Sequence, residues 1–398
     1  MMSQSTPFPR SQRVSHMQPS STLLVVQAAA RLRAQGIQVI DLGAGEPDFP
    51  TPHHIKQAAQ QAIADNFTKY TPAAGIPELK QAIVESLYAE YQVEYTPAQV
   101  IATAGAKQAI FNAIVSLINP GDEVLIPSPY WVTFPEIVAF AQGRSVYIDT
   151  EPTGFHLTAD LVQAHITPRS RLLILNSPCN PTGRVIPPET YRQIVETAVA
   201  HGLYIIADEC YREFVYPPAV RFCAGQLPNE LRSHLMICGS LSKTYAMTGW
   251  RLGYALGPQA WIDEMVKVAS HSTSNPTSIS QKAALAALRG PREPVEAMLN
   301  EYRRRRDYLI PALNQLPGIH CDMPDGAFYA FVNIKHLLAN GPLQTSDEVQ
   351  LRLLEDFHVA LTAGSAFGVE GYLRISYANS MEALERGVEQ IRAFIESL

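Results

Sequence analysis

Short apolar runs rich in β-branched residues alternate with longer stretches of helical periodicity through the middle of the chain. The runs predict strands at residues 99–102, 123–126, 145–148, 171–175, 203–207, 235–238 and 252–255. Helix-like stretches such as 107–117 and 188–201 separate most of them. Continuous apolar strands separated by helices are typical of parallel sheets that are covered on both faces. The pattern predicts an α/β domain with a mostly parallel, seven-stranded sheet.

The two ends of the chain show a different pattern. Residues 20–34 have helical periodicity, end before Gly36, and are followed by a short predicted strand at 38–42. After about residue 275 a long helical region runs to about residue 316, and three strand-like runs follow: GAFYAFVNI, VALTAGSAF and YLRISYA. We expect a large domain at residues 49–299 and a smaller, discontinuous α+β domain formed by residues 13–48 and 300–398.

Composition and charge argue against several classes of partner. Of the 398 residues, 46% are hydrophobic and 17% are charged, which is ample for a large core. A formal net charge of −6 gives no reason to expect nucleic acid or an anionic membrane. The dense basic cluster at 303–306 lies in a helix-like stretch, where a solvated helix face is the favoured interpretation. No run approaches the roughly 18 apolar residues that a membrane-spanning helix needs.

The cysteines and the first residues predict a soluble cytoplasmic protein. Five cysteines are an odd number, and none are paired at CxxC spacing, so a closed disulfide framework is not expected. Reduced thiols are the rule in the cytoplasm. The first dozen residues lack the apolar run of a signal peptide.

Several common motifs begin in this sequence but are not completed. Gly43 and Gly45 start like a dinucleotide fingerprint, but the third glycine is missing and Pro47 interrupts the expected helix. Lys243 is preceded by Ser242, where a P-loop requires glycine. Neither HExxH nor a nucleophile elbow occurs. The eleven histidines show no ligand spacing, so we expect no metal site.

Polar residues follow three of the predicted strands. Asn180 follows the strand at 171–175, Asp208 follows 203–207, and Lys243 follows 235–238. Because the carboxyl ends of parallel strands share one edge of a sheet, these residues point to a ligand crevice there. An aspartate in that position is either a helix cap or a buried charge that needs a partner. Arg251, eight residues after Lys243, offers a bidentate grip on a phosphate.

Six motifs together carry a resemblance to a known family. They are LGAGEPDF, KYTPAAGIPELK, NSPCNPTG, ADECY, SLSKTYAMTGWRLGY and YLRISYA, in this order along the chain. In sequence and spacing they resemble the class I aminotransferases of fold type I, which use pyridoxal 5′-phosphate (PLP). The resemblance extends from about residue 14 to the end, and the nearest subgroup is the bacterial aspartate aminotransferases of the I-γ type.

The resemblance implies a catalytic role for Lys243, Asp208 and Tyr211 and a cofactor contact for Asn180. Lys243 matches the lysine that forms a Schiff base with PLP and then moves a proton to and from the substrate. Asp208 matches the partner of the pyridine nitrogen, where a carboxylate keeps that nitrogen protonated so that the ring accepts electrons. Tyr211 and Asn180 match the residues that donate hydrogen bonds to the 3′ oxygen of the cofactor.

The same resemblance implies how the cofactor's phosphate and ring are bound. Gly105, Ala106 and Lys107 open a helix after a strand, which is a ready anion site. Ser240 and Arg251 are expected to complete this phosphate cradle.

Two further expectations concern the ring and the oligomeric state. Trp131, in PYWVTFP, matches the aromatic residue that stacks on the ring, with core packing as the alternative. Tyr70 resembles a tyrosine that reaches the phosphate from the neighbouring subunit, and residues 274–276 resemble a stretch contributed by the partner. We therefore expect a homodimer with shared active sites.

The substrate is expected to be a dicarboxylic amino acid. Arg374 matches the arginine that binds the α-carboxylate, assisted by the backbone of Gly45 and by Asn180 and Trp131. Lys107 matches the lysine that binds the distal carboxylate in the I-γ type. The subgroup that uses a partner's arginine instead would place it near residue 270, which is a serine here.

Aspartate as donor and 2-oxoglutarate as acceptor are the first choice. An aromatic or broad-specificity aminotransferase that includes prephenate is the alternative, and so is another PLP reaction such as a lyase. Prephenate is the weaker choice because Gln18 stands where many relatives have lysine. A non-enzymatic regulator is disfavoured because the chain is acidic and few residues precede the first strand. The resemblance also predicts cis peptide bonds at Asn180-Pro181 and Ser128-Pro129.

Overall fold

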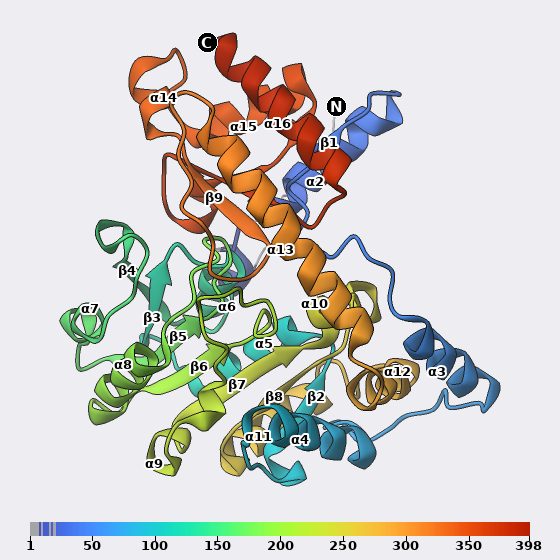
Figure 1. The fold of residues 1–398 in the computed structure, drawn as a ribbon. Helices are drawn as coiled ribbons and strands as arrows, with labels where there is room; N and C mark the ends of the chain where they lie inside the picture. Colours follow the sequence, from blue (N-terminus) through green and yellow to red (C-terminus); the bar gives the residue numbers. More distant parts are fainter. Residues whose placement is uncertain (1–7, 9–10, 16, 19–20) are drawn as a thin grey trace, which may run out of the picture.

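A seven-stranded mixed sheet forms the centre of the larger part of the molecule (Figure 1). The computed structural model describes residue 8 and residues 11–15, 17–18 and 21–398. The strand order is β2-β8-β7-β6-β5-β3-β4, and β8 alone runs antiparallel to its neighbours, so the predicted fold class is confirmed. The strands are β2 (Val100–Thr103), β3 (Glu123–Ser128), β4 (Arg144–Asp149), β5 (Ser170–Asn176), β6 (Tyr204–Asp208), β7 (Leu235–Ser240) and β8 (Gly253–Leu256).

Helices cover both faces of this sheet, which explains why its strands are apolar on both sides. In β5, Leu172 and Ile174 face one core, whereas Leu173 and Leu175 face the other. The first core is closed by α5 (Ala106–Leu117), α6 (Thr133–Phe140) and α11 (Gln259–Ser270). The helices that contribute to the opposite core are α3 (His53–Ala64), α4 (Pro77–Tyr91), α7 (Ala159–His165), α8 (Pro188–Ala200), α9 (Asn229–Arg232), α10 (Leu241–Thr244) and α12 (Ser278–Arg289).

The smaller part of the molecule has a core of its own. A three-stranded antiparallel sheet has the order β11-β12-β9, and a two-stranded parallel sheet joins β1 to β10. These strands are β1 (Ile40–Asp41), β9 (Tyr329–Asn333), β10 (Val359–Ala360), β11 (Thr362–Ala363) and β12 (Tyr372–Ser376). The helices here are α2 (Ser21–Ala34), α13 (Glu293–Asn314), α14 (Lys335–Asn340), α15 (Ser346–Phe357) and α16 (Met381–Glu396), whereas the short helix α1 (Gln12–Ser15) contacts α6 of the larger part.

The amino-terminal segment packs with the carboxyl-terminal part of the chain. Val25 and Ala29 of α2 share a small core with Leu354 and Ala360. The long helix α13 belongs to both parts, because Val295 contacts the large core and the helix from Met298 onward contacts the smaller one. In Figure 1 it crosses the molecule from the lower part to the upper part. The domain boundaries given above stay a prediction.

The predicted helical region after residue 275 consists of two helices, because α12 ends at Arg289 and α13 begins at Glu293. Pro291 disfavours a helical conformation of Gly290, and a side chain at Gly290 would come within 2.5 Å of the Ala286 carbonyl oxygen. The chain therefore turns at this point and redirects α13 toward the smaller core.

The arginine cluster is only half solvated. Arg303 and Arg304 are exposed, but the side chains of Arg305 and Arg306 are 6% and 7% exposed. Arg305 forms an ion pair with Asp48 at 2.8 Å, and Arg306 donates to the Pro324 carbonyl oxygen at 2.9 Å. The helical pattern did not show that other segments cover one face of α13 here.

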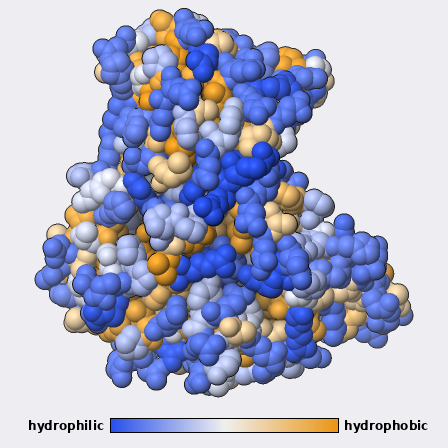
Figure 2. Space-filling view, in the orientation of Figure 1, coloured by the Kyte–Doolittle hydropathy of each residue, from blue (hydrophilic) through white to orange (hydrophobic). Residues whose placement is uncertain are grey.

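One face of the molecule is mostly hydrophilic, with hydrophobic residues in small separate groups (Figure 2). Among the described residues, no helix is both long enough and apolar enough to cross a membrane.

Candidate active site

The carboxyl ends of β5, β6 and β7 bring the predicted strand-end residues to one edge of the large sheet. Asn176, the last residue of β5, pairs in register with Asp208, the last residue of β6. The Asn176 amide donates to the Asp208 carbonyl oxygen at 3.1 Å and accepts from the Asn180 backbone N–H at 2.9 Å. The peptide bonds Ser128-Pro129 and Asn180-Pro181 are cis, which confirms that prediction.

Lys243 lies on the short helix α10, directly after β7, and its side chain is mostly buried. Its Nζ donates to the carbonyl oxygen of Gly45, which comes from the far end of the chain. The pKa of Lys243 is lowered to about 8, chiefly by burial; Cys210 and Glu46 oppose this shift, and the cations Arg251 and Arg374 contribute to it. A neutral amine is therefore accessible to Lys243 near physiological pH, as a nucleophile or proton acceptor requires.

Asp208 is buried and lacks a cationic partner. Its carboxylate accepts a hydrogen bond from the Cys210 backbone N–H at 3.1 Å, and none of the described residues forms an ion pair with it. Burial raises the pKa of Asp208 to about 6. A buried carboxylate at a ligand crevice without an ion pair is suited to a ligand that brings its own positive charge, such as a protonated pyridine nitrogen.

Arg374 of β12 is brought to the same place from the smaller part of the molecule. It is 3% exposed, and its Nη1 donates to the Asn180 amide oxygen at 3.0 Å while Nη2 donates to the Gly43 carbonyl oxygen at 2.7 Å. Its buried Nε has no hydrogen-bond partner among the residues that the structure describes. The guanidinium lies over the rings of Tyr329 and Phe367, at 4.5 and 4.9 Å from their centroids. A fixed guanidinium with a free donor suits an anionic ligand.

Tyr211 and Tyr329 share a hydrogen bond inside this site. Their hydroxyl oxygens are 2.7 Å apart, and both side chains are buried. Tyr329 was not found by sequence reasoning, although its strand was predicted. It follows from the register of β9 and β12, where Phe331 pairs with Arg374, so that Tyr329 lies diagonally beside Arg374 on the same face. Asn176 and Phe367 were missed for the same reason, because strand pairing was needed to place them.

The amino terminus of α5 forms a cationic corner. Gly105 caps this helix with a φ of +84°, which favours glycine, and Arg251 lies so close that a side chain at Gly105 would come within 2.6 Å of it. The first turn of α5 contains no acidic residue, and its free N–H groups attract anions. The Arg251 guanidinium donates to the Thr248 and Ala104 carbonyl oxygens at 3.0 and 3.4 Å.

Two other predicted phosphate ligands lie at this corner. Gly253 of β8 packs so tightly that a Cβ would meet the Ala106 backbone nitrogen at 2.3 Å, so Ala106 is held against the sheet. Ser240 caps α10 by accepting from the Ser242 N–H at 3.0 Å, so its hydroxyl hydrogen is available to a ligand. The group fits a phosphate by its charges and its donors.

Lys107 and Trp131 lie together beside this corner. The Lys107 Nζ is 5.0 Å from the centre of the Trp131 ring, and burial lowers the pKa of Lys107, with Arg251 as the second cause. Trp131 is partly buried and makes an edge contact with Phe134 of α6 at 5.4 Å. Lys107 and Arg251 line a cavity of about 780 Å³, to which Gln18 also contributes. Lys107 therefore faces open space, as a ligand-binding cation must.

Tyr70 is the one predicted site residue that this chain does not bring to the site. It is 90% exposed in the single chain, so its role in a partner's site stays a prediction. Ser274, in the other stretch attributed to the partner, has a left-handed φ of +60°.

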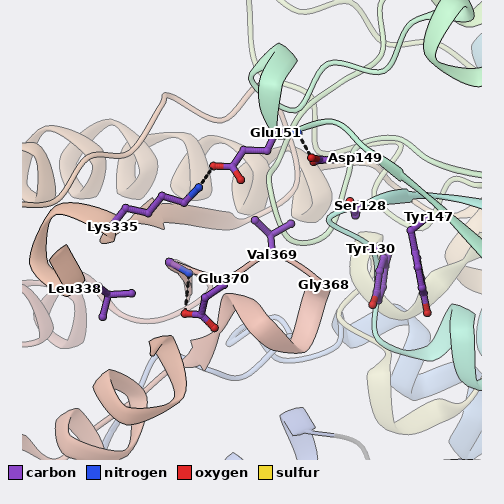
Figure 3. Close-up of a pocket in the computed structure, with 11 residues that line it drawn as sticks. Ser128, Tyr130, Tyr147, Asp149, Glu151, Lys335, Leu338, Gly368, Val369 and Glu370 are labelled. Carbon is purple, nitrogen blue, oxygen red and sulfur yellow. Dashed lines mark hydrogen bonds and ion pairs between the residues drawn. The ribbon is translucent and has the colours of Figure 1, made fainter. Parts of the chain in front are cut away.

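A second cavity of about 670 Å³ lies between the two parts of the molecule (Figure 3). Lys335 of α14 points to Glu151 across it and forms an ion pair, and the Tyr372 hydroxyl donates to the same carboxylate at 2.9 Å. Tyr130 and Tyr147 stack on its wall with centroids 5.0 Å apart. Because Tyr372 lies on β12 with Arg374, these contacts link the strand that carries Arg374 to the large sheet.

Comparisons with known proteins agree on one family. The sequence profile of class I and II aminotransferases matches residues 37–391. The chain is 44% identical to an aspartate aminotransferase of Geobacillus stearothermophilus, over 97% of this chain and 98% of that protein. It is 42% identical to an aspartate/prephenate aminotransferase of Nitrosomonas europaea, over 97% and 99%.

Solved structures give the same result. The aspartate aminotransferase of Thermus thermophilus with maleate superimposes with a TM-score of 0.92 at 41% identity, covering 97% of this chain and 99% of that one. The enzyme of Rhizobium meliloti gives a TM-score of 0.93 at 41% identity, over 98% and 99%. Both similarities extend over the whole fold described above.

Proposed function

This chain belongs to the class I and II aminotransferases, and from that premise we propose that it transfers the amino group of aspartate to 2-oxoglutarate, with PLP held at Lys243. The observation that carries the choice of a dicarboxylic substrate is the presence of two separate cations, Lys107 and Arg374, around one lysine. The charges of Arg251 and Arg374 lower the pKa of Lys243, and the charge of Arg251 also lowers that of Lys107, so Arg251 lies near both lysines.

The residues present fit PLP at each of its charged ends. The buried Asp208, which has no ion pair among the described residues, suits the pyridine nitrogen. The phosphate fits the amino terminus of α5 with Ser240 and Arg251, and the phenolic oxygen fits Tyr211 and Asn180. When bound, PLP supplies an electron sink for the bond that breaks at the substrate's Cα.

The chain's own groups then perform the remaining work. The Lys243 Nζ, with its lowered pKa, would accept the proton from the substrate's Cα and return it to C4′ of bound PLP. Asp208 would keep the pyridine nitrogen protonated, because a buried carboxylate is most stable beside a positive charge. Trp131 would stack on the ring and limit its movement.

The substrate is held at both ends. Arg374 binds the α-carboxylate with its planar fork, and the free Nε of its guanidinium and the backbone of Gly45 complete that contact. Lys107 binds the second carboxylate from the cavity wall. Desolvation of Lys107 makes its charge costly until a carboxylate neutralises it, so the site prefers a dicarboxylic substrate.

Prephenate is the second candidate substrate, because relatives at 41–42% identity are named aspartate/prephenate aminotransferases. Prephenate also has two carboxylates, so Lys107 and Arg374 suit it as well. Gln18, which lines the cavity, offers it no further cation. The first choice is therefore aspartate.

The test contrasts two variants. Lys107→Ala should lower kcat/KM for aspartate and glutamate by about 10- to 100-fold, since a charge-assisted hydrogen bond is worth roughly 1.5–3 kcal/mol. It should leave phenylalanine and alanine nearly unchanged, whereas Arg374→Ala should damage all four donors. Steady-state kinetics with 2-oxoglutarate as acceptor measures both. Equal losses for aspartate and phenylalanine in Lys107→Ala would refute the dicarboxylate assignment.

A further inference from the structure

One buried hydroxyl in the site has no role in the function proposed above. Tyr329 is the first residue of β9 and is 1% exposed. Its hydroxyl lies 2.7 Å from that of Tyr211, which belongs to the loop after β6. The bond therefore joins the smaller sheet to the carboxyl edge of the large sheet. A buried hydroxyl pair is costly to separate, so it fixes the position of both rings.

Tyr329 also contacts the two other groups assigned to the substrate's α-carboxylate. Its ring centroid is 4.5 Å from the Arg374 guanidinium. A side chain at Gly45 would come within 2.8 Å of the Tyr329 hydroxyl, so that hydroxyl lies against the Gly45 backbone. The carbonyl of Gly45 in turn accepts from the Lys243 Nζ. Tyr329 thus contacts Arg374 and Gly45, which are assigned to the substrate, and Tyr211, which is assigned to the cofactor. Through Gly45 it is also linked to the reactive lysine.

The donor direction of the Tyr211–Tyr329 bond decides what Tyr211 can do. A hydroxyl has one hydrogen and two acceptor sites. If Tyr211 donates to Tyr329, it has no hydrogen left for a ligand; if Tyr329 donates, Tyr211 keeps its hydrogen and becomes a stronger donor, because linked hydrogen bonds polarise one another. The two oxygens are equally able to donate in the geometry observed.

We propose that Tyr329 is a positioning residue that donates to the Tyr211 oxygen and thereby directs the Tyr211 hydrogen to the phenolic oxygen of bound PLP. This role rests on the proposed function, which assigns Tyr211 to that oxygen. Because the same ring supports Arg374, the tyrosine pair also ties the cofactor contact to the α-carboxylate contact.

The test is the pH at which the visible absorbance band of the holoenzyme changes. A hydrogen bond to the phenolic oxygen stabilises its anion, so weakening the bond moves the midpoint to higher pH. Tyr211→Phe should give the largest rise. Tyr329→Phe should raise the midpoint by about 0.3–0.6 pH unit, which is roughly a two- to fourfold change in the proton-binding constant. The double variant should match Tyr211→Phe alone, since Tyr329 acts through Tyr211.

Two readouts separate positioning from a general structural effect. Tyr216→Phe is the matched control, because it removes another buried hydroxyl of the same core, one that donates to the Ala327 carbonyl oxygen at 2.7 Å. It should leave the midpoint unchanged. Tyr329→Phe keeps the ring beside Arg374, so its KM for aspartate should stay within about twofold of the parent, as expected when only a neutral hydrogen bond is lost elsewhere.

Three results would overturn the inference, and they are distinguishable. A midpoint that does not move in Tyr329→Phe would mean that its hydroxyl does not act on Tyr211. An equal shift in the parent and in the Tyr211→Phe background would mean that Tyr329 acts by another route. A protein that develops no visible band with PLP would overturn the proposed function itself, and this inference with it.

Discussion

At the scale of single residues, burial has opposite effects on the two ionisable groups beside the candidate cofactor site. It lowers the pKa of Lys243 to about 8 and raises that of Asp208 to about 6. In both cases desolvation disfavours the charged form. Lys243 thereby becomes available as a neutral amine, and Asp208 becomes dependent on a positively charged ligand. Both shifts suit a ligand that has an aldehyde and a basic ring nitrogen, as PLP does.

The lowered pKa of Lys243 predicts how cofactor uptake depends on pH. Only the neutral amine attacks an aldehyde, so the rate at which the apoprotein develops the visible band with PLP should rise with pH and level off above about 8. An ordinary lysine would continue to gain neutral amine up to about pH 10.5. Stopped-flow absorbance over pH 6–10 measures this, with roughly half-unit steps and PLP in excess. A rate that still climbs tenfold between pH 9 and 10 would contradict the account.

The residues of the site divide into those that the sequence could predict and those that it could not. Asn180, Asp208 and Lys243 follow apolar strands, and their common edge follows from a parallel sheet. Tyr329 and Phe367 depend on how β9, β11 and β12 pair and on the approach of two parts of the chain. Hydrophobic periodicity contains no information on that pairing. Their places became visible only in three dimensions.

At the scale of elements, the strands of the large sheet were predicted within one or two residues, because most are apolar and are bounded by turn residues. The short strands were harder. The expected strand at 38–42 is only Ile40–Asp41, and VALTAGSAF divides into β10, β11 and a 3₁₀ helix (Gly364–Phe367). Such two-residue strands are defined by their partners rather than by their own pattern, so the sequence could not give their limits.

Helix α13 shows what periodicity alone cannot reveal. Arg305 lies beside the rings of Phe49 and Tyr302, with its guanidinium 5.2 and 5.4 Å from their centroids, and binds Asp48. Asp48 is more than 250 positions away in the sequence. It follows shortly after Gly45, so this ion pair holds the loop that reaches the candidate active site.

A pair of neighbouring arginines tests that role. Arg305→Ala leaves the carboxylate of Asp48 without its buried partner and should cost about 2–3 kcal/mol of unfolding free energy. Arg304→Ala on the same helix removes an exposed contact to Glu301 and should cost less than about 0.5 kcal/mol. Urea unfolding at matched protein concentration compares them. Similar midpoints for the two variants would show that the Asp48 contact does not hold the loop.

At the scale of the whole molecule, the candidate active site lies where the cores of the larger and smaller parts meet. Asp208 ends β6 of the large sheet and Lys243 lies on α10 directly after β7, whereas Arg374 and Tyr329 belong to the smaller sheet. The contacts of Glu151 with Lys335 and Tyr372 join the same two parts at the neighbouring cavity (Figure 3). A relative movement of the two parts would therefore change the site directly. In the predicted homodimer a second chain would also contribute to each site, because the structure records no contact of Tyr70 with the site of its own chain.

Complementation tests the predicted dimer. Tyr70→Ala and Lys243→Ala should each be weakly active or inactive, because the first removes a contact to the cofactor's phosphate and the second removes the lysine that holds the cofactor. If Tyr70 serves the partner's site, a mixed dimer contains one site with both residues intact. Mixing the variants under conditions that allow subunits to exchange should then restore up to about a quarter of the parent's activity per subunit, since half of the dimers are mixed and each has one intact site. Activity no greater than the sum of the two variants would argue that each site is built from one chain.

The central claim is that Lys243 holds the cofactor. The most direct measurement is reductive trapping of the PLP-loaded protein with borohydride, followed by digestion and mass spectrometry of every lysine-containing peptide. The account predicts a stable pyridoxyl group on Lys243 alone, and none when Lys243→Ala is treated in the same way. A pyridoxyl group on Lys107 or on another lysine of the parent, with Lys243 unmodified, would contradict it.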